Sequence, residues 1–445
     1  MTEGNIVRHL ITFAFPLFIG NIFQQLYNTV DTWVVGNYVS NEAFSAVGSV
    51  GPIINLLIGF FLGLSSGAGV VISQYYGAKK YDRVHDTVHT ALLMTLILAV
   101  LFTALGIFMT PYMLTLMKTP AEVVPDAATY LRIYFSGVVG LMIYNIGSGI
   151  LRALGDSQRP FYFLVVSAVL NTILDLVFVI VFDMGVAGVA LATIIAQGVS
   201  AVLVLILLLR TDLCIRLIPR DLKLHRDMLM KIIRVGIPAA IQMAITSFSN
   251  IFVQSYINYF GPDCMSGWTA YSKIDQFIFL PMQSLALSAT TFVGQNLGID
   301  QTERARRGSD IALFIAAGMT VVIIIPIVIF APAFVSFFND KPEVVECGAK
   351  LLRWLSPFYV FCSVNQIYSG ALRGAGNSRA PMVIMLLSFV LFRQIYLFVM
   401  SNFIMNELIP IAMGYPAGWL LCSLLVFVYY KNARLSKSRL VEDNE

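Results

Sequence analysis

The dominant pattern along the chain is a series of long apolar stretches separated by short polar connections. A helix needs about 20 apolar residues to span a bilayer, and backbone groups cannot stay unpaired in lipid. Twelve stretches meet this requirement, at 10–38, 48–76, 87–110, 128–151, 161–182, 186–209, 236–259, 268–294, 309–330, 351–372, 381–404 and 414–430. The pattern therefore predicts an all-α integral membrane protein with twelve transmembrane helices.

Composition agrees with this assignment. Of the 445 residues, 58% are hydrophobic and only 12% are charged, whereas a soluble domain carries about 25% charged residues. The formal charge of +4 does not indicate nucleic-acid binding. None of the five cysteines forms a CxxC pair, and the four histidines lie in or beside hydrophilic segments. We therefore expect no enzyme activity, no cofactor and no histidine- or cysteine-based metal site.

Basic residues gather in alternate connections, which predicts the orientation in the membrane. With twelve spans, one side holds most of them: Arg8, Lys79, Lys80, Arg83, Arg152, Arg159, the seven in 210–234, Arg304, Arg306, Arg307, Arg373, Arg379 and the four in 431–439. The other side holds only Lys118, Arg132, Lys341, Lys350 and Arg353. Both termini and the central loop are thus predicted to be cytoplasmic, in a multi-pass protein of the cell membrane.

The two halves of the chain repeat each other. SGILRALGDSQRP at 148–160 and SGALRGAGNSRAP at 369–381 match at seven of thirteen positions, with an offset of 221. Pro16 and Asn28 correspond to Pro238 and Asn250 at an offset of 222. Repeats on this scale are typical of transporters. We predict two pseudo-symmetric six-helix bundles, an N-lobe at 1–210 and a C-lobe at 236–430, joined by a cytoplasmic loop at 211–235 and followed by a cytoplasmic tail at 431–445.

Acidic residues inside the expected spans are candidates for a functional role, because inserting a charged side chain at the bilayer centre costs about 2.5–3.5 kcal/mol. Asp31 lies deep in the first span, and Asp175 lies in the fifth with Asn171 four residues before it, on the same helix face. Thr193 in the sixth span is a further oxygen ligand. Burial and like charge both favour protonation of such a pair. The group could bind H⁺ or Na⁺, or could instead clamp helices together.

The C-terminal half lacks these acids, because Val253, Phe392 and Tyr396 stand at the positions that correspond to Asp31, Asn171 and Asp175. Polar stripes on the first and seventh spans are expected to face a substrate cavity or to bond between helices. We assign to this cavity Gln24, Asn28, Gln242, Thr246, Asn250, Gln254 and Arg393. Lys273 and Asp275 begin the eighth span, where they could be solvated, and Arg393 could pair with a carboxylate or snorkel.

Several segments together resemble the MATE family, the multidrug and toxic compound extrusion transporters. They are YNTVDTWVVG (27–36), LRALGDSQRP (151–160), NTILD (171–175), GVAGVALAT (185–193) and FVGQNLG (292–298). The resemblance implies a V-shaped pair of six-helix lobes. It also implies antiport of cationic, lipophilic compounds against H⁺ or Na⁺, with Asp31, Asn171, Asp175 and Thr193 as the coupling-ion site and Pro16 as the residue where the first helix bends.

The sequence departs from the family in the C-lobe, where some members carry a second cation site. Here Thr246 and Cys362 stand in those regions, and Ser148 stands where some relatives carry Asn. We therefore expect coupling through the N-lobe, in a monomer within the lipid bilayer. The main alternatives are a flippase for a lipid-linked saccharide and an exporter of an endogenous metabolite. An intramembrane enzyme and a passive channel fit the sequence less well.

Overall fold

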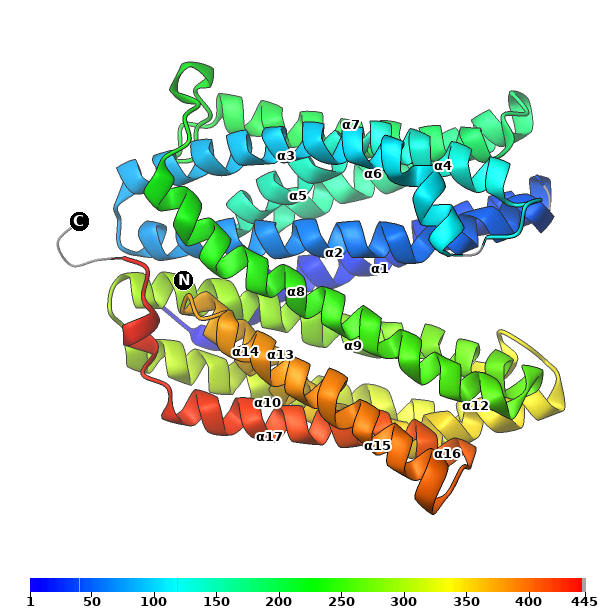
Figure 1. Ribbon diagram of the computed structural model, residues 1–445. Coiled ribbons are helices and arrows are strands. Elements are labelled where there is room, and N and C mark those ends of the chain that lie inside the picture. The colour runs from blue at the N-terminus through cyan, green and yellow to red at the C-terminus, as the bar shows by residue number, and fades with distance from the viewer. Residues whose placement is uncertain (40, 118, 442–445) are drawn as a thin grey trace. The chain divides into compact units, whose positions relative to one another are not determined.

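A computed structural model describes residues 1–39, 41–117 and 119–441. In these ranges every regular element is a helix (Figure 1). The α-helices are α1 (Ile6–Tyr38), α2 (Asn41–Gly77), α3 (Tyr81–Leu116), α4 (Val124–Ser136), α5 (Val138–Ala153), α6 (Gln158–Leu176), α7 (Gly185–Arg210), α8 (Arg226–Ile257), α9 (Pro262–Gly298), α10 (Thr302–Ile329), α11 (Ala331–Ser336), α12 (Pro342–Leu355), α13 (Tyr359–Gly374), α14 (Arg379–Met385), α15 (Arg393–Val399), α16 (Leu408–Ala412) and α17 (Gly414–Asn432).

Short helices of other types extend or join these elements. The π-helices are η1 (Val177–Val181), η5 (Leu386–Phe392) and η6 (Met400–Ile404). The 3₁₀-helices are η2 (Pro219–Asp221), η3 (Asn258–Phe260), η4 (Ser356–Phe358) and η7 (Leu435–Ser438). The fold class is therefore all-α, as the hydrophobic pattern predicts.

The helices are long and apolar enough for a membrane protein. Within the described ranges ten of them could cross a membrane, or eleven if α4 and α5, bent by 48° where they meet at Gly137, form one span. The remaining expected span, 351–372, falls on the end of α12, η4 and most of α13. Pro357 interrupts the helix there, because proline has no backbone N–H to donate.

The chain forms two compact units, and each boundary lies at a proline inside a helix. The N-terminal unit is Pro16–Ile237, and the C-terminal unit is Pro238–Glu445 together with Met1–Phe15. Pro16 lies within α1 and Pro238 within α8. These two prolines correspond in the sequence repeat. Each boundary therefore divides a helix, α1 or α8, at the same position of the repeat.

The internal repeat is visible in the backbone. Gly155 and Gly376, which correspond at the offset of 221, both adopt positive φ, 97° and 93°. Each ends a helix in the left-handed conformation that glycine reaches without a Cβ penalty. Lys79 and Asp300 also correspond, and their φ values are 58° and 60°. The sequence repeat therefore specifies the same turns twice.

The first fifteen residues pack within the C-terminal unit. Leu10 and Ala14 are buried in a cluster with residues of α9, α10 and α13. Ser288 on α9 donates a hydrogen bond to the carbonyl of Leu10 at 3.1 Å, and Arg304 donates to the carbonyl of Gly4 at 2.9 Å. The start of α1 is thus held by this unit, although the rest of α1 belongs to the other.

The start of α8 packs in the same manner within the N-terminal unit. Lys231 donates to the hydroxyl of Tyr75 at 2.7 Å. At Gly67 on α2 the backbones come so close that an added Cβ would lie 2.6 Å from Gly236 Cα. Small residues permit such close helix packing in membrane proteins. The segment before Pro238 is therefore fixed to α2.

Candidate functional site

The two acidic residues of the N-terminal unit lie together in its interior. Asp31 on α1 is 7% exposed, and Asp175 on α6 is fully buried. Their carboxyl groups interact directly with each other. Asn171, one helical turn before Asp175, is also buried. The fold thus brings together Asp31 and Asp175, which are 144 positions apart in the sequence.

Most polar atoms of this group have no hydrogen-bond partner. Among the described residues, this holds for Asp31 Oδ1, both carboxylate oxygens of Asp175 and both amide atoms of Asn171. A buried polar group left unpaired costs about 1–3 kcal/mol. Two ionised carboxylates can only accept, so neither can satisfy the other. A proton on one carboxyl group, or a cation bound to the carboxylate oxygens, would provide the missing hydrogen-bond donor or positive charge.

Two tyrosines that the sequence analysis missed lie beside the acids. Tyr130 and Tyr134 on α4 are 5% and 6% exposed, and their rings stack with centroids 6.3 Å apart. The phenol of Tyr130 interacts with Asp31, Asp175 and Thr193. Their i, i+4 spacing places both on one helix face, but nothing in the sequence ties that face to the acids.

Thr193 on α7 is 8% exposed and joins the same group. Its hydroxyl donates to the carbonyl of Val189 at 3.0 Å, which leaves lone pairs on Oγ1. Just after Asp175, α6 changes into the π-helix η1. Single π-helical turns occur frequently at functional sites. The N-terminal unit therefore holds a compact set of carboxylate, amide, hydroxyl and phenol groups.

The expected cavity residues of the seventh span have varied environments. Gln242 is 4% exposed, donates to the carbonyl of Ser378 at 3.2 Å and accepts from Arg373 at 3.3 Å. Thr246 donates to the carbonyl of Gln242 within its own helix. Asn250 is exposed and accepts from the hydroxyl of Tyr415 at 2.9 Å.

The other expected cavity residues lie on both units. Gln254 donates to Asn258 at 2.7 Å. On the first span, Gln24 is partly exposed and Asn28 is exposed. Pro16, the expected bend, is buried within α1.

Arg393 is the largest fully buried side chain among the described residues. Its guanidinium lies over the rings of Phe389 and Tyr415, 4.6 and 4.4 Å from their centroids. It donates to Ser249 Oγ at 3.1 Å, while its Nε has no partner. No carboxylate in the described part of the chain forms an ion pair with it. Aromatic faces therefore stabilise this cation.

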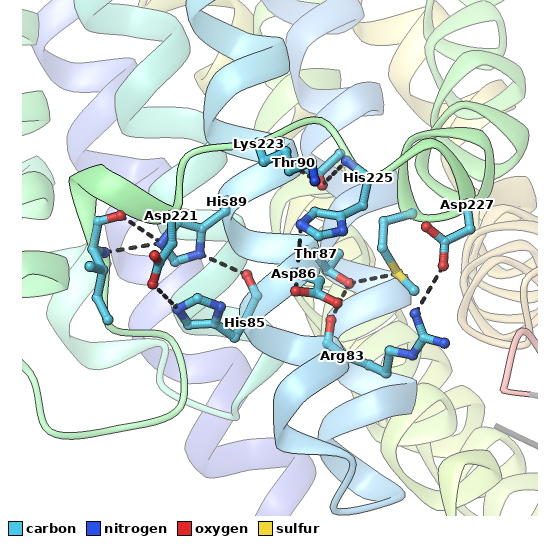
Figure 2. Close-up of polar contacts among 12 residues, drawn as sticks. Arg83, His85, Asp86, Thr87, His89, Thr90, Asp221, Lys223, His225 and Asp227 are labelled. Atoms are coloured by element: carbon cyan, nitrogen blue, oxygen red, sulfur yellow. Dashed lines mark hydrogen bonds and ion pairs between the residues drawn. The ribbon is translucent and has the colours of Figure 1, made fainter.

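Histidines hold the connection between α7 and α8 against α3 (Figure 2). His89 is fully buried, its Nδ1 donates to the carbonyl of His85 at 2.8 Å, and its Nε2 accepts from the N–H of Ile218 at 3.0 Å. His225 lies 3.5 Å from Asp86, and Arg83 pairs with Asp227 at 3.0 Å. These contacts fasten the connection to the N-terminal unit, and no metal-binding group of His, Cys, Asp or Glu occurs in the described ranges.

Comparison with known proteins assigns the family. The MatE family model matches twice, at residues 16–177 and 238–399, and both matches begin at the prolines that start the units. The probable multidrug resistance protein YpnP of Bacillus subtilis is 30% identical over 99% of this chain and 98% of its own. An FAD transporter of Shewanella oneidensis is 24% identical over 81% of this chain and 78% of its own.

A solved structure supports the same assignment at the level of the fold. A MOP superfamily transporter from Pyrococcus furiosus has a TM-score of 0.93, with 23% identity over 98% of this chain and 97% of its own. The family model and the relative YpnP extend over both units, and the apolar helices suit a multi-pass membrane protein. The chain therefore belongs to the MatE family of membrane transporters.

Proposed function

We propose that this protein exports lipophilic organic cations in exchange for H⁺ or Na⁺, bound at Asp31, Asn171, Asp175 and Thr193. The observation that carries the proposal is the set of buried polar atoms around Asp175 that lack hydrogen-bond partners. A helix clamp would be expected to satisfy its own polar atoms. A site that alternately binds and releases a cation is expected to keep such polar atoms free to bind that cation.

The exchange follows from electrostatics. Two carboxylates in an apolar interior repel each other and are poorly solvated, so the site is stable only when a positive charge neutralises it. A coupling ion and a cationic substrate therefore replace each other. An inside-negative potential favours inward movement of the coupling ion by about 2.3 kcal/mol per charge per 100 mV. Both termini and the loop 211–235 lie in the cytoplasm in this proposal.

A bend at Pro16 is the proposed link between the site and the rest of the protein. Proline removes one backbone hydrogen bond and permits a helix to bend. Asp31 lies on the same helix, fifteen residues later. A change of charge at Asp31 would then alter the angle of α1 at the residue where the chain passes from one unit to the other. Gln24, Asn28, Gln242, Thr246, Asn250, Gln254 and Arg393 remain proposed contacts for the substrate.

Export of an endogenous anionic metabolite is the second candidate. It is favoured by the relative named an FAD transporter, since FAD carries a diphosphate. A buried Arg393 without a carboxylate partner also suits an anionic group better than a cation. The two functions differ in the sign of the charge that is moved, so one assay separates them.

The test uses purified protein in liposomes, with a fluorescent lipophilic cation and either a proton or a sodium gradient imposed alone. Wild type should move the dye with one gradient only, which identifies the coupling ion. Asp31→Asn should abolish movement, because the neutral amide no longer needs a cation. The control is Asp183→Asn, an exposed acid-to-amide change in the same unit at a residue with φ of 51°, which asparagine tolerates.

Two results would count against the proposal. Dye movement by Asp31→Asn at the wild-type rate would remove the N-terminal site from coupling. Absence of dye movement by wild type, combined with uptake of FAD in the same liposomes, would replace cation export by metabolite export.

A further inference from the structure

The C-terminal unit contains an acidic group that the proposed coupling site does not use. Asp275 lies within α9 and is only partly exposed. The hydroxyl of Tyr359 on α13 donates a hydrogen bond to Asp275 Oδ1, and the hydroxyls of Tyr359 and Tyr271 lie 2.9 Å apart. Both tyrosines are buried, at 0% and 2% exposed. One carboxylate therefore ends a chain of two buried phenols.

This group belongs to the C-terminal half alone. At the repeat offset of 221, Asp275 corresponds to Ile54, Tyr271 to Val50 and Tyr359 to Val138. All three polar residues thus replace aliphatic ones. Asp31 and Asp175 show the reverse. Their counterparts in the C-terminal half are Val253, which is apolar, and Tyr396, which does not ionise at neutral pH. Each half has its own acidic group at a position where the other half has none.

Aromatic side chains enclose the phenol chain. The ring centroids of Trp268 and Tyr271 are 5.0 Å apart, and those of Tyr359 and Trp419 are also 5.0 Å apart. Tyr415 completes the circuit, at 5.4 Å from Trp268 and 5.7 Å from Trp419. These are contact distances for aromatic pairs, so the rings pack on one another around the phenol chain.

The ligand chemistry follows from the same geometry. A sodium ion prefers several oxygen acceptors, whereas the side chains that form the hydrogen-bond chain with Asp275 are phenols, which donate hydrogen bonds to a carboxylate. A proton needs no space. When Asp275 is ionised, Tyr359 donates to it; when Asp275 is protonated, its own O–H can donate to Tyr359 and the chain reverses direction. In either state both phenol oxygens take part in a hydrogen bond of the chain.

We propose that Asp275, Tyr271 and Tyr359 form a proton-binding site in the C-terminal unit, separate from the proposed coupling-ion site. The proposal rests on the proposed function, because it adds a proton to the same antiport cycle. Asp275 gains the proton from solvent and Tyr359 and Tyr271 hold the hydrogen-bond chain in either state. The transporter then binds its coupling ion, H⁺ or Na⁺, in the N-terminal unit and a proton in the C-terminal unit.

Several titratable groups interact with Asp275. On α9 this is Tyr271, on α13 they are Tyr359 and Cys362, and on α17 it is Tyr415. Among the described residues, α10, α11, α12 and η3 contribute no charged group that interacts with it. The guanidinium of Arg393 stacks on Tyr415 and does not contact Asp275 directly in any hydrogen bond or ion pair of the described residues.

The experiment is an infrared titration of the purified protein in lipid nanodiscs. Protonated carboxyl groups absorb apart from carboxylates, so each titrating acid is counted without any transport. Asp275→Asn should remove one titrating component. Tyr359→Phe should move the midpoint of that component to higher pH, by roughly one unit, because the carboxylate loses its donor. Asp263→Asn is the matched control on α9, an exposed acid paired with Lys341 at 2.6 Å, and should leave the component unchanged.

The outcomes decide the proposal separately from the proposed function. If Asp275→Asn titrates like wild type, Asp275 does not bind a proton and the proposal is overturned. If Asp275→Asn does not fold, Tyr359→Phe decides: a moved midpoint supports the site and an unchanged one overturns it. Asp31→Asn should remove a different component. If wild type does not move the dye in liposomes but its infrared titration still shows the Asp275 component, the proposed function is rejected and the proton-binding site remains.

Discussion

A close backbone contact between α2 and α8 in the N-terminal unit gives a prediction that can be worked out from distances. At Gly67, an added Cβ would lie 2.6 Å from both Cα and N of Gly236, and 2.7 Å from the carbonyl oxygen of Ile232. Carbon atoms in contact normally lie about 3.5–4.0 Å apart. The atoms in the way belong to the backbone, so no rotamer change can relieve the clash. In Gly67→Ala, the start of α8 must move away from α2 by about 1 Å.

The expected cost is about 1–3 kcal/mol, the usual range for overpacking a tight interior. For a unit of this size, each kcal/mol lowers the melting temperature by roughly 2–4 °C. We therefore expect Gly67→Ala to melt about 5 °C below wild type. Fluorescence-detected thermal unfolding of the purified protein in detergent measures this shift.

Gly48→Ala is the control, because it makes the same chemical change on the same helix where an added Cβ meets nothing within 4 Å. It should match wild type or gain slightly, since alanine favours a helix over glycine by about 1 kcal/mol. Equal melting temperatures for Gly67→Ala and Gly48→Ala would show that α8 does not rest on α2 at this place. The assignment of 226–237 to the N-terminal unit would then be wrong.

Three further predictions concern the connection between α7 and α8. His89→Ala removes the acceptor for the N–H of Ile218 and should speed tryptic cleavage of the exposed connection about fivefold, the equivalent of one hydrogen bond of about 1 kcal/mol. The control variant His9→Ala, in the other unit, should be cleaved at the wild-type rate. An equal increase in both variants would show that His89 does not anchor the connection. Burial raises the pKa of the Cys214 thiol, so less reactive thiolate is present at neutral pH and maleimide labelling should rise with pH later than for an exposed cysteine. An impermeant maleimide should reach Cys214 in everted vesicles only, and labelling in intact cells would reverse the proposed topology.

The acidic residues show how far a sequence can be interpreted. Asp31, Asn171 and Asp175 attract attention because charge and amide groups are costly in an apolar span, and that cost does not depend on the fold. The partners of the acids are different. Tyr130 and Tyr134 are amphipathic and common in membrane helices, so only their position on α4 beside Asp31 distinguishes them. Their spacing was visible, but nothing in the sequence tied it to the acids.

Asp275 and Arg393 illustrate the opposite case. Near the start of its span, Asp275 could be solvated, and no sequence rule indicates that two buried phenols and a ring of aromatic side chains come to it from α9, α13 and α17. Arg393 could have paired with a carboxylate. Instead it stacks on Phe389 and Tyr415, contacts that need residues from two helices.

The sequence by itself determined the all-α class, the apolar spans, the repeat and the acids of the N-terminal half. These depend on composition and on short-range periodicity, which lipid and the helix impose locally. Only the tertiary structure decided that Met1–Phe15 belongs with the C-terminal unit and that the start of α8 belongs with the N-terminal unit. It alone also placed Tyr359 against Asp275. Such pairings depend on which helix faces meet across long sequence separations, and neither hydropathy nor spacing records that.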